Sequence, residues 1–96
     1  MKTPKIEDIE KYSCETYGVT MEQVKEKQTR RKQPLKAKRL ILYMVIEYDV
    51  MSNVDTISHY SSSYDIVNRA YWGIAQKRKD DLELNSVITE FENKLK

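Results

Sequence analysis

The segment that most constrains the fold is the apolar run LILYMVI at residues 40–46. It lies within a pattern typical of one helix, which we expect to begin with Pro34 and Leu35 and to cover residues 35–50. Proline fits the first turn of a helix, and a helix that is apolar on every side belongs inside a bundle. The run is too short to span a bilayer, which takes ~20 apolar residues. The segment therefore predicts the central helix of a small all-α bundle of five to six helices.

The remaining periodic segments supply the other helices of this bundle. Their apolar residues recur at spacings of three and four, and cap signals mark several of their starts. Thr20 and Gln23 can form a reciprocal capping box, and Gly18 fits the left-handed position that ends a helix. Thr3 and Pro4 indicate the start of the first helix, with Thr3 as its cap. We expect these helices at residues 4–17, 21–27, 53–60, 62–78 and 81–95.

Three consecutive serines, Ser61, Ser62 and Ser63, stand between the fourth and fifth of the six helices. A serine hydroxyl can accept a hydrogen bond from a free backbone N–H at a helix start. We therefore expect Ser62 or Ser63 to cap the fifth helix and Ser61 to lie in the turn. A flexible linker would not be followed at once by a regular apolar stripe. The side chains that we expect to face the core are Val54 and Ile57 on the fourth helix and Ile66, Val67, Ala70, Tyr71 and Ile74 on the fifth.

The charge of the chain is strongly asymmetric. Residues 25–39 hold eight basic residues and one acidic residue, a local charge of +7, whereas the whole chain carries +2. We expect an exposed basic loop at residues 28–33, which leads into the central helix. A patch of one sign attracts a polyanion, and nucleic acid is the commonest one in the cytoplasm. A solvated run of charges with no partner is the alternative interpretation.

A short helix, a tight turn and a long helix together describe a helix-turn-helix unit. In such a unit the outer face of the second helix enters the major groove of DNA. Asparagine can pair with adenine and arginine with guanine, while backbone amides and serine hydroxyls at the helix start suit a phosphate. The outer face of the fifth helix comprises Ser62, Ser63, Tyr64, Asp65, Asn68, Arg69 and Trp72.

Two residues of this outer face have competing explanations. Asp65 can accept a hydrogen bond from cytosine, but an acid in the first turn also complements the helix dipole, which is the explanation we favour. Trp72 can contact DNA, but we favour a half-buried position against the last helix.

Several sequence motifs occur along the chain in an order that is also found in one known protein family. IEDIEKYSCETYGVTMEQV is a helix that ends in Tyr before a Gly-Val step, and RRKQPLKAKRLILYMVIE is a basic loop that leads into an apolar helix ending in Glu. SHYSSSYDI, NRAYWGIAQ and ELNSVITEFENKL follow. This order resembles the C-terminal DNA-binding domain (domain IV) of the bacterial replication initiator DnaA, which is related in shape to the Trp-repressor helix-turn-helix.

The resemblance implies a double-stranded DNA-binding module that regulates replication or transcription. The chain holds no Gly-x-x-x-x-Gly-Lys-Ser/Thr loop, so we do not expect it to bind or hydrolyse ATP. The basic loop would then act as a minor-groove or backbone arm, the entrance of the central helix would contact phosphates, and the fifth helix would read bases. The predicted DNA-binding residues are Arg30, Arg31 and Lys32 of the loop, Lys36, Lys38 and Arg39 of the entrance, and Ser62, Ser63, Tyr64, Asp65, Asn68 and Arg69 of the fifth helix.

The segment SHYSSSYDI is shorter than the Gly-Gly-Arg-Asp-His-type signature of that family and lacks its glycines. This difference favours an alternative function, a protein–protein interaction adaptor that kept the fold but lost DNA reading. Tyr64 and Trp72 would be its anchors. RNA binding is a third and weaker option, because the aromatic residues lie on a helix rather than on a stacking sheet.

Few residues could support catalysis or metal binding. His59 is the only histidine and Cys14 the only cysteine, so the chain offers neither an internal disulfide nor a set of metal ligands. We expect Cys14 to be a small packed side chain and His59 to lie on or near the surface. The sequence therefore predicts no enzyme activity, cofactor, small-molecule substrate or membrane partner. The N-terminus lacks a signal-peptide hydrophobic region, which favours a cytoplasmic protein with one domain over residues 1–96.

Overall fold

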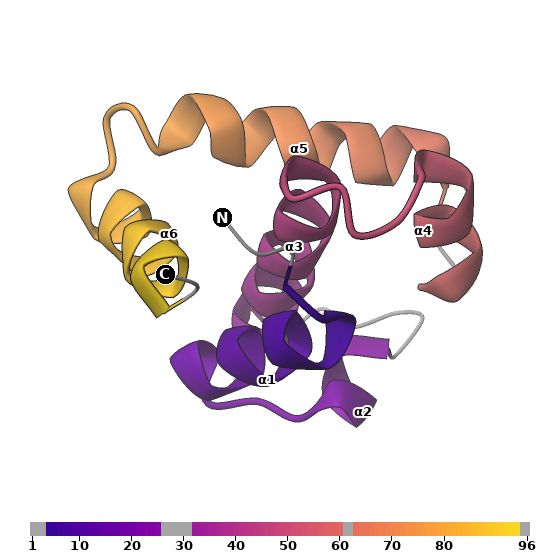
Figure 1. Cartoon of the computed structure of the whole chain (residues 1–96), viewed down its shortest axis with the longest axis horizontal. Helices are drawn as coiled ribbons and strands as arrows, with labels where there is room; N and C mark the ends of the chain where they lie inside the picture. The colour runs from indigo at the N-terminus through magenta and orange to yellow at the C-terminus, as the bar shows by residue number, and fades with distance from the viewer. Residues whose placement is uncertain (1–3, 26–31, 61–62, 95–96) are drawn as a thin grey trace.

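The computed structural model describes residues 4–25, 32–60 and 63–94, which form six α-helices and no strand (Figure 1). The helix α3 (Lys32–Glu47) lies at the centre of the bundle. Within the described residues, every helix is too short or too polar to cross a membrane. The six helices confirm the all-helical architecture that was predicted from the sequence. The other helices are α1 (Ile6–Tyr17), α2 (Met21–Lys25), α4 (Asn53–His59), α5 (Tyr64–Lys77) and α6 (Leu82–Lys94).

The hydrophobic core surrounds the middle of α3. The side chains of residues 40–45 are all buried, which is the outcome expected for a helix that is apolar on every side. Helices α1 and α5 lie against α3 along much of their length. They contribute Ile9 from α1 and Val67 and Ile74 from α5, and α2 contributes Val24. In Figure 1, α5 lies across the top of the bundle, with α1 and α2 below it.

The bounds of α3 differ from the predicted range of 35–50. The helix begins earlier, so that Lys32 belongs to its first turn rather than to a loop, and Pro34 also lies in that turn. Proline is accepted there because the first backbone N–H groups have no partner within the helix. The helix ends at Glu47, since Asp49 takes a left-handed conformation with a φ of 54°.

This left-handed turn follows a recurrent pattern of helix termination. The N–H of Val50 donates to the carbonyl of Val45 at 2.9 Å, and the N–H of Asp49 donates to the carbonyl of Ile46 at 3.2 Å. These two bonds satisfy carbonyls that the end of a helix would otherwise leave free. They also turn the chain away from α3, so that α4 can begin at Asn53.

The first helix begins later than predicted. Pro4 is buried but precedes the helix, and Lys5 occupies the cap position without a side-chain hydrogen bond. The predicted cap Thr3 lies outside the described residues. At the other end, Gly18 has a φ of 64°, which confirms its predicted left-handed position. Cys14 is buried on α1, as expected.

Side-chain caps are present at the starts of α2, α4 and α5, and those of α2 and α5 were predicted above. The N–H of Thr20 donates to the Gln23 side chain at 3.0 Å, and the N–H of Gln23 donates to the Thr20 hydroxyl at 3.3 Å. Ser52 accepts from the N–H of Asp55 at 3.1 Å, at the start of α4. Ser63 accepts from the N–H of Ile66 at 3.2 Å, so Ser63 is the cap of α5. Residues 26 and 27, predicted as the end of α2, lie outside the described residues.

Two predicted core positions were wrong. Val54 is 75% exposed, and α4 instead turns Thr56 toward the core, with Tyr60 buried just after the helix. Ile66 is 50% exposed, while Val67, Ala70 and Ile74 form the buried stripe of α5. Both misplaced residues lie in the first turn of their helices, where one apolar residue does not fix which face turns inward. Ile57 and Tyr71 are partly buried, as predicted for the inner faces.

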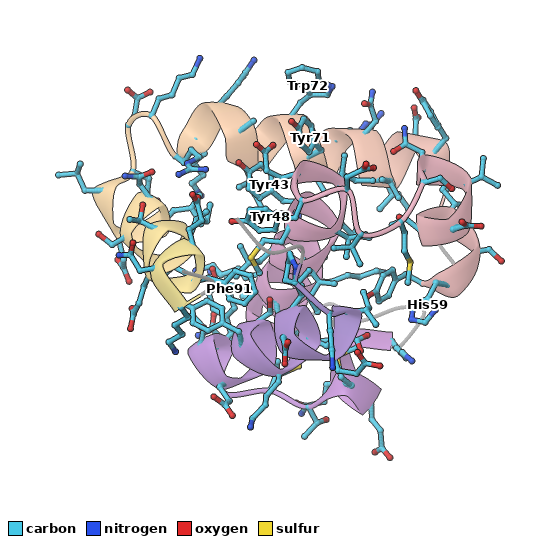
Figure 2. The ribbon with its side chains drawn as sticks, viewed as in Figure 1. Tyr43, Tyr48, His59, Tyr71, Trp72 and Phe91 are labelled. Atoms are coloured by element: carbon cyan, nitrogen blue, oxygen red, sulfur yellow. The ribbon has the colours of Figure 1, made fainter. Side chains whose placement is uncertain are left out.

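The last helix, α6, is attached to the bundle mainly through large side chains. The ring of Phe91 lies 5.0 Å from the ring of Tyr12 and 5.9 Å from the ring of Tyr48, measured between centroids. The Tyr12 hydroxyl donates to the carbonyl of Val87 at 2.7 Å. Figure 2 shows Tyr48 and Phe91 in the space between α3 and α6. Aromatic rings therefore fill the distance between these two helices.

Arg78, just after α5, ties α6 to α3. Its Nε donates to Asn85 Oδ1 at 3.0 Å, and its Nη1 donates to the Tyr43 hydroxyl at 2.9 Å. Its Nη2 lies 3.6 Å from Glu92 Oε1. We call these four residues the Arg78 cluster. Because guanidinium hydrogen bonds are directional, the Arg78 cluster orients α6 relative to α3 and α5.

Candidate nucleic-acid interface

Helix α5 has two exposed flanks, one on each side of its buried stripe. One flank, which we call the groove flank, carries Ile66, Arg69, Gly73 and Lys77 and lines a groove beside α3. The spacing of these residues by three or four places them along one side of the helix. The opposite flank carries aromatic side chains and is described below.

The groove has a volume of about 720 Å³ and runs between α5, the first half of α3, and α6. Basic side chains from two helices line it: Lys36, Lys38 and Arg39 from α3, and Arg69 and Lys77 from α5. None of the described residues forms an ion pair with the three basic residues of α3. Their positive charges are therefore available to an external anion.

The charge of the groove changes along its length. Asp81 and Glu83 line its α6 end, so the positive potential is confined to the part between α3 and α5. Gly73 lies between Arg69 and Lys77 and is exposed. A Cβ at Gly73 would meet no atom within 4 Å, so packing does not require a glycine there. The groove flank is bare at this point and allows close approach to the backbone of α5.

Arg69 has a partner on its own helix. Its Nη2 lies 3.7 Å from Asp65 Oδ2, one turn earlier, and both side chains are highly exposed. Exposed pairs of this spacing stabilise a helix by only about 0.3–0.5 kcal/mol. Arg69 can therefore leave Asp65 for a phosphate or a base edge. Asp65 also lies in the first turn of α5, where an acid complements the helix dipole.

The other exposed side of α5, which we call the aromatic flank, borders a separate hollow of about 360 Å³. Trp72 is 57% exposed and Tyr64 is 61% exposed. Trp72 borders this hollow and contacts Tyr71, so the expectation that it packs against the last helix was wrong. Figure 2 shows Trp72 on the outer side of α5. The residues that line the hollow are Ile46, Asn53, Tyr64, Val67, Asn68, Tyr71 and Trp72.

A chain of aromatic contacts fixes the position of Tyr71 beneath Trp72. The Tyr71 hydroxyl donates to Glu47 Oε2 at 2.8 Å, and its ring stacks on Tyr43 at 5.3 Å and 25°. The hydrogen bond to the Glu47 carboxylate is the main reason that the pKa of Tyr71 is raised above its ordinary value. Trp72 meets Tyr71 edge to face, at 5.2 Å and 85°. Trp72 is therefore supported from within while most of its surface remains exposed.

The predicted DNA-binding residues divide into four groups in the structure. Lys36, Lys38, Arg39 and Arg69 come together at the groove, whereas Tyr64 and Asn68 border the hollow on the other flank. The Ser63 hydroxyl is occupied as the cap of α5, Asp65 pairs with Arg69, and Lys32 is an exposed residue in the first turn of α3. Arg30, Arg31 and Ser62 lie outside the described residues.

Three residues of these surfaces were missed from the sequence. Gly73 and Lys77 line the groove, and Asn53 of α4 lines the hollow. The spacing of Lys77 from Arg69, two helical turns, was a usable signal for the groove flank. Asn53 carried no such signal, because its position depends on how α4 packs beside α5.

His59 lies beside Glu10, and Cys14 is buried on α1. The Nε2 of His59 lies 4.0 Å from Glu10 Oε2, and the neighbouring Tyr60 hydroxyl donates to the same carboxylate oxygen at 3.2 Å. Burial is the main cause of the raised pKa of Cys14. Across residues 4–25, 32–60 and 63–94, no group of three or more His, Cys, Asp or Glu residues is arranged to hold a metal ion.

No protein-family model matches the chain, and no curated protein matches it either.

Proposed function

We propose that the chain binds double-stranded DNA and catalyses no reaction, as a replication or transcription regulator of the DnaA domain IV type. The observation that carries the proposal is the groove between α3 and α5. Three basic residues near the start of α3 and two on α5 line it, and these helices are distant in sequence from one another. The part of the groove between α3 and α5 is lined by basic side chains, and a surface with one sign of charge concentrates a polyanion of the opposite sign.

The elements α4 and α5 would form the helix-turn-helix unit. The short α4 ends at His59, and the longer α5 begins after the Ser63 cap. Asn68 and Arg69 are exposed in the first half of α5, where recognition helices contact bases. Lys36, Lys38 and Arg39 would hold the phosphate backbone beside this helix.

Electrostatic contact with the DNA phosphates can be tested by measuring the affinity for duplex DNA at several salt concentrations. We expect fluorescence anisotropy to give a plot of log affinity against log salt with a slope of about −0.9 for each phosphate neutralised. The double variant Lys36→Gln/Arg39→Gln should lower the affinity for all duplex sequences and flatten the slope by about 2. Lys11→Gln, an exposed change on α1 outside the groove, is the matched control. A failure of the unmodified protein to bind any duplex at low salt rejects the proposal.

Base reading requires a separate test, because Asn68 can contact a base without contributing charge to the groove. A duplex selected by the protein from a random library would first define its preferred site. Asn68→Ala should then reduce the preference for that site by about 1–3 kcal/mol, with little change on unrelated duplexes, and Arg69→Ala should reduce the preference similarly while also weakening unrelated duplexes through the loss of one charge. If the preference persists in both variants, α5 is not the recognition helix.

A protein-interaction adaptor is the second candidate function. The observation that favours it is the exposure of four large apolar side chains on α4 and α5: Val54, Tyr64, Ile66 and Trp72. Aromatic residues of this kind often anchor protein interfaces. A pull-down with and without nuclease distinguishes the two functions, since partners held through DNA are lost after nuclease treatment while direct protein partners remain.

A further inference from the structure

We propose that the hollow on the aromatic flank of α5 binds an unpaired nucleobase. This inference rests on the proposed function, because the groove flank of the same helix would hold the nucleic acid. The two surfaces are joined by adjacent residues, since Asn68 borders the hollow and Arg69 borders the groove. A base that leaves the stack near Arg69 would therefore find the hollow on the opposite side of α5.

The hollow supplies a stacking surface. An indole ring has two faces, and the edge-to-face contact with Tyr71 can cover at most one of them. The exposure of Trp72 leaves room for a planar ligand on the other face. Tyr64, two turns earlier on α5, is a second exposed ring at the border of the same hollow. Stacking of a base on an aromatic side chain is worth about 1–3 kcal/mol in nucleic-acid complexes.

The hollow also supplies hydrogen-bonding groups suited to a base. The side chains of Asn53 and Asn68 are exposed and border it from α4 and α5. A carboxamide both donates and accepts, which matches the mixed donors and acceptors on the Watson–Crick edge of a base. Among the described residues, no side-chain hydrogen bond already engages either amide.

These two features together select a base that is unpaired. In a duplex, the faces of a base are covered by its stacked neighbours and its Watson–Crick edge is occupied by its partner. Only a base outside the stack can offer a face to Trp72 and an edge to Asn53 or Asn68. The volume of about 360 Å³ accommodates one base and its sugar rather than a helix.

The test compares a paired duplex with the same duplex carrying one bulged adenosine. Trp72 is the only tryptophan in the chain, so its fluorescence reports on the hollow. We expect the bulged duplex to quench this fluorescence and to bind about tenfold more tightly than the paired duplex. Free adenosine monophosphate is the third probe. Quenching by the free nucleotide without a preference for the bulged duplex would identify the occupant as a free nucleotide.

Substitutions test whether the preference for the bulged duplex arises at the hollow. Trp72→Leu should reduce the preference for the bulged duplex to about one, as measured by anisotropy of labelled DNA. The Lys36→Gln/Arg39→Gln variant should weaken binding of the bulged and paired duplexes by the same factor. Val54→Ala removes an exposed apolar side chain that does not border the hollow, and it should retain the preference. Circular dichroism would verify that each variant keeps its helices.

The outcomes separate the two proposals. Equal affinity for both duplexes, with unchanged Trp72 fluorescence, overturns the nucleobase site and leaves duplex binding intact. Absence of binding to both duplexes rejects the proposed function together with this inference. Loss of the preference in the control Val54→Ala would also overturn it, because a general apolar surface would then explain the preference.

Discussion

Helices α1 and α6 both flank the central helix, but they are held in different ways. The backbone of α1 approaches α3 closely, and α1 buries Ile9, Ser13 and Cys14 at their contact. The backbone of α6 does not approach α3 as closely, and α6 buries only Ile88 and Phe91. The position of α6 depends on the aromatic rings that lie between α6 and its neighbours and on the Arg78 cluster. We infer that α1 belongs to the cooperative core, whereas α6 can open locally before the rest unfolds.

This difference matters for the groove, because α6 supplies its acidic end. Asp81 and Glu83 limit the positive region to the part between α3 and α5. If α6 opened, these acids would move away and the basic groove would become longer. The four predictions below test the contrast between the two attachments, from the largest expected effect to the smallest.

Removal of a core side chain in α3 should destabilise the whole bundle. Leu40 is fully buried, and Leu40→Ala should lower the free energy of unfolding by about 2–5 kcal/mol through lost burial and a cavity. Urea denaturation followed by circular dichroism measures the change. Leu82→Ala is the matched control on α6, because Leu82 is highly exposed and its loss should change stability by less than about 0.5 kcal/mol. Similar losses in both variants would contradict the assigned core.

Removal of the Arg78 side chain should affect α6 more than α1. Arg78→Met keeps much of the aliphatic length but removes the bonds to Tyr43 and Asn85, with an expected loss of about 1–3 kcal/mol. Amide hydrogen exchange should accelerate in α6 and change little in α1. Lys79→Met, on an exposed neighbour, controls for the loss of one positive charge. Equal acceleration in the two helices would mean that α6 unfolds only with the core.

Alkaline pH should weaken the attachment of α1 and that of α6, because a buried tyrosine lies beside each helix. Burial, followed by the nearby Glu10 carboxylate, raises the pKa of Tyr60 beside α1, and burial with the nearby Glu92 raises the pKa of Tyr48 beside α6. A raised pKa favours the neutral phenol in the folded state. Stability is therefore fully present below about pH 10, the pKa of an unfolded tyrosine, and falls as pH rises toward the folded values.

The expected slope is at most about 1.4 kcal/mol per pH unit for each tyrosine. Urea midpoints measured from pH 8 to pH 11 would reveal it, with these pH values marking roughly either side of the unfolded tyrosine pKa. Tyr60→Phe and Tyr48→Phe should each reduce the slope, and Tyr64→Phe, an exposed control, should not. A flat profile in the unmodified protein would show that neither phenol is held in its neutral form.

The left-handed turn after α3 should be improved by glycine, and the gain should stabilise the core that includes α1. Asp49 has a φ of 54°, and a residue with a Cβ is strained there. Asp49→Gly should raise the free energy of unfolding by about 0.5–1 kcal/mol. Asp49→Ala is the reverse control and should be destabilising. Hydrogen exchange should slow in α1, which opens with the core, and should change little in α6, which can exchange through local opening.

The sequence predicted those parts of the fold that depend on neighbouring residues. The capping box of Thr20 and Gln23, the left-handed Gly18 and the Ser63 cap are local signals, and all three are present. The apolar run of α3 predicted a buried helix because no face of it could be exposed. Its end was misjudged, since nothing in the sequence distinguishes Asp49 as the residue that becomes left-handed.

The parts that depend on tertiary packing were less predictable. Val54 and Ile66 are apolar, and at a helix start their direction is decided by how the helix lies on its neighbours. The predicted outer face of α5 is exposed, but its division into a groove flank and an aromatic flank depends on α3 and α4 lying on opposite sides. The basic residues of α3 were identified from the sequence, whereas their alignment with Arg69 and Lys77 required the structure.

The glycine at position 73 limits the stability of α5. Glycine in a helix interior costs about 1 kcal/mol relative to alanine, and here no neighbour would resist the added methyl group. Alanine would therefore give a more stable α5, and also a raised surface in the middle of the groove flank. Glycine at this position agrees with the proposed function, because functional surfaces commonly sacrifice some stability for activity. Stabilised versions of this protein should accordingly be sought at positions away from the groove.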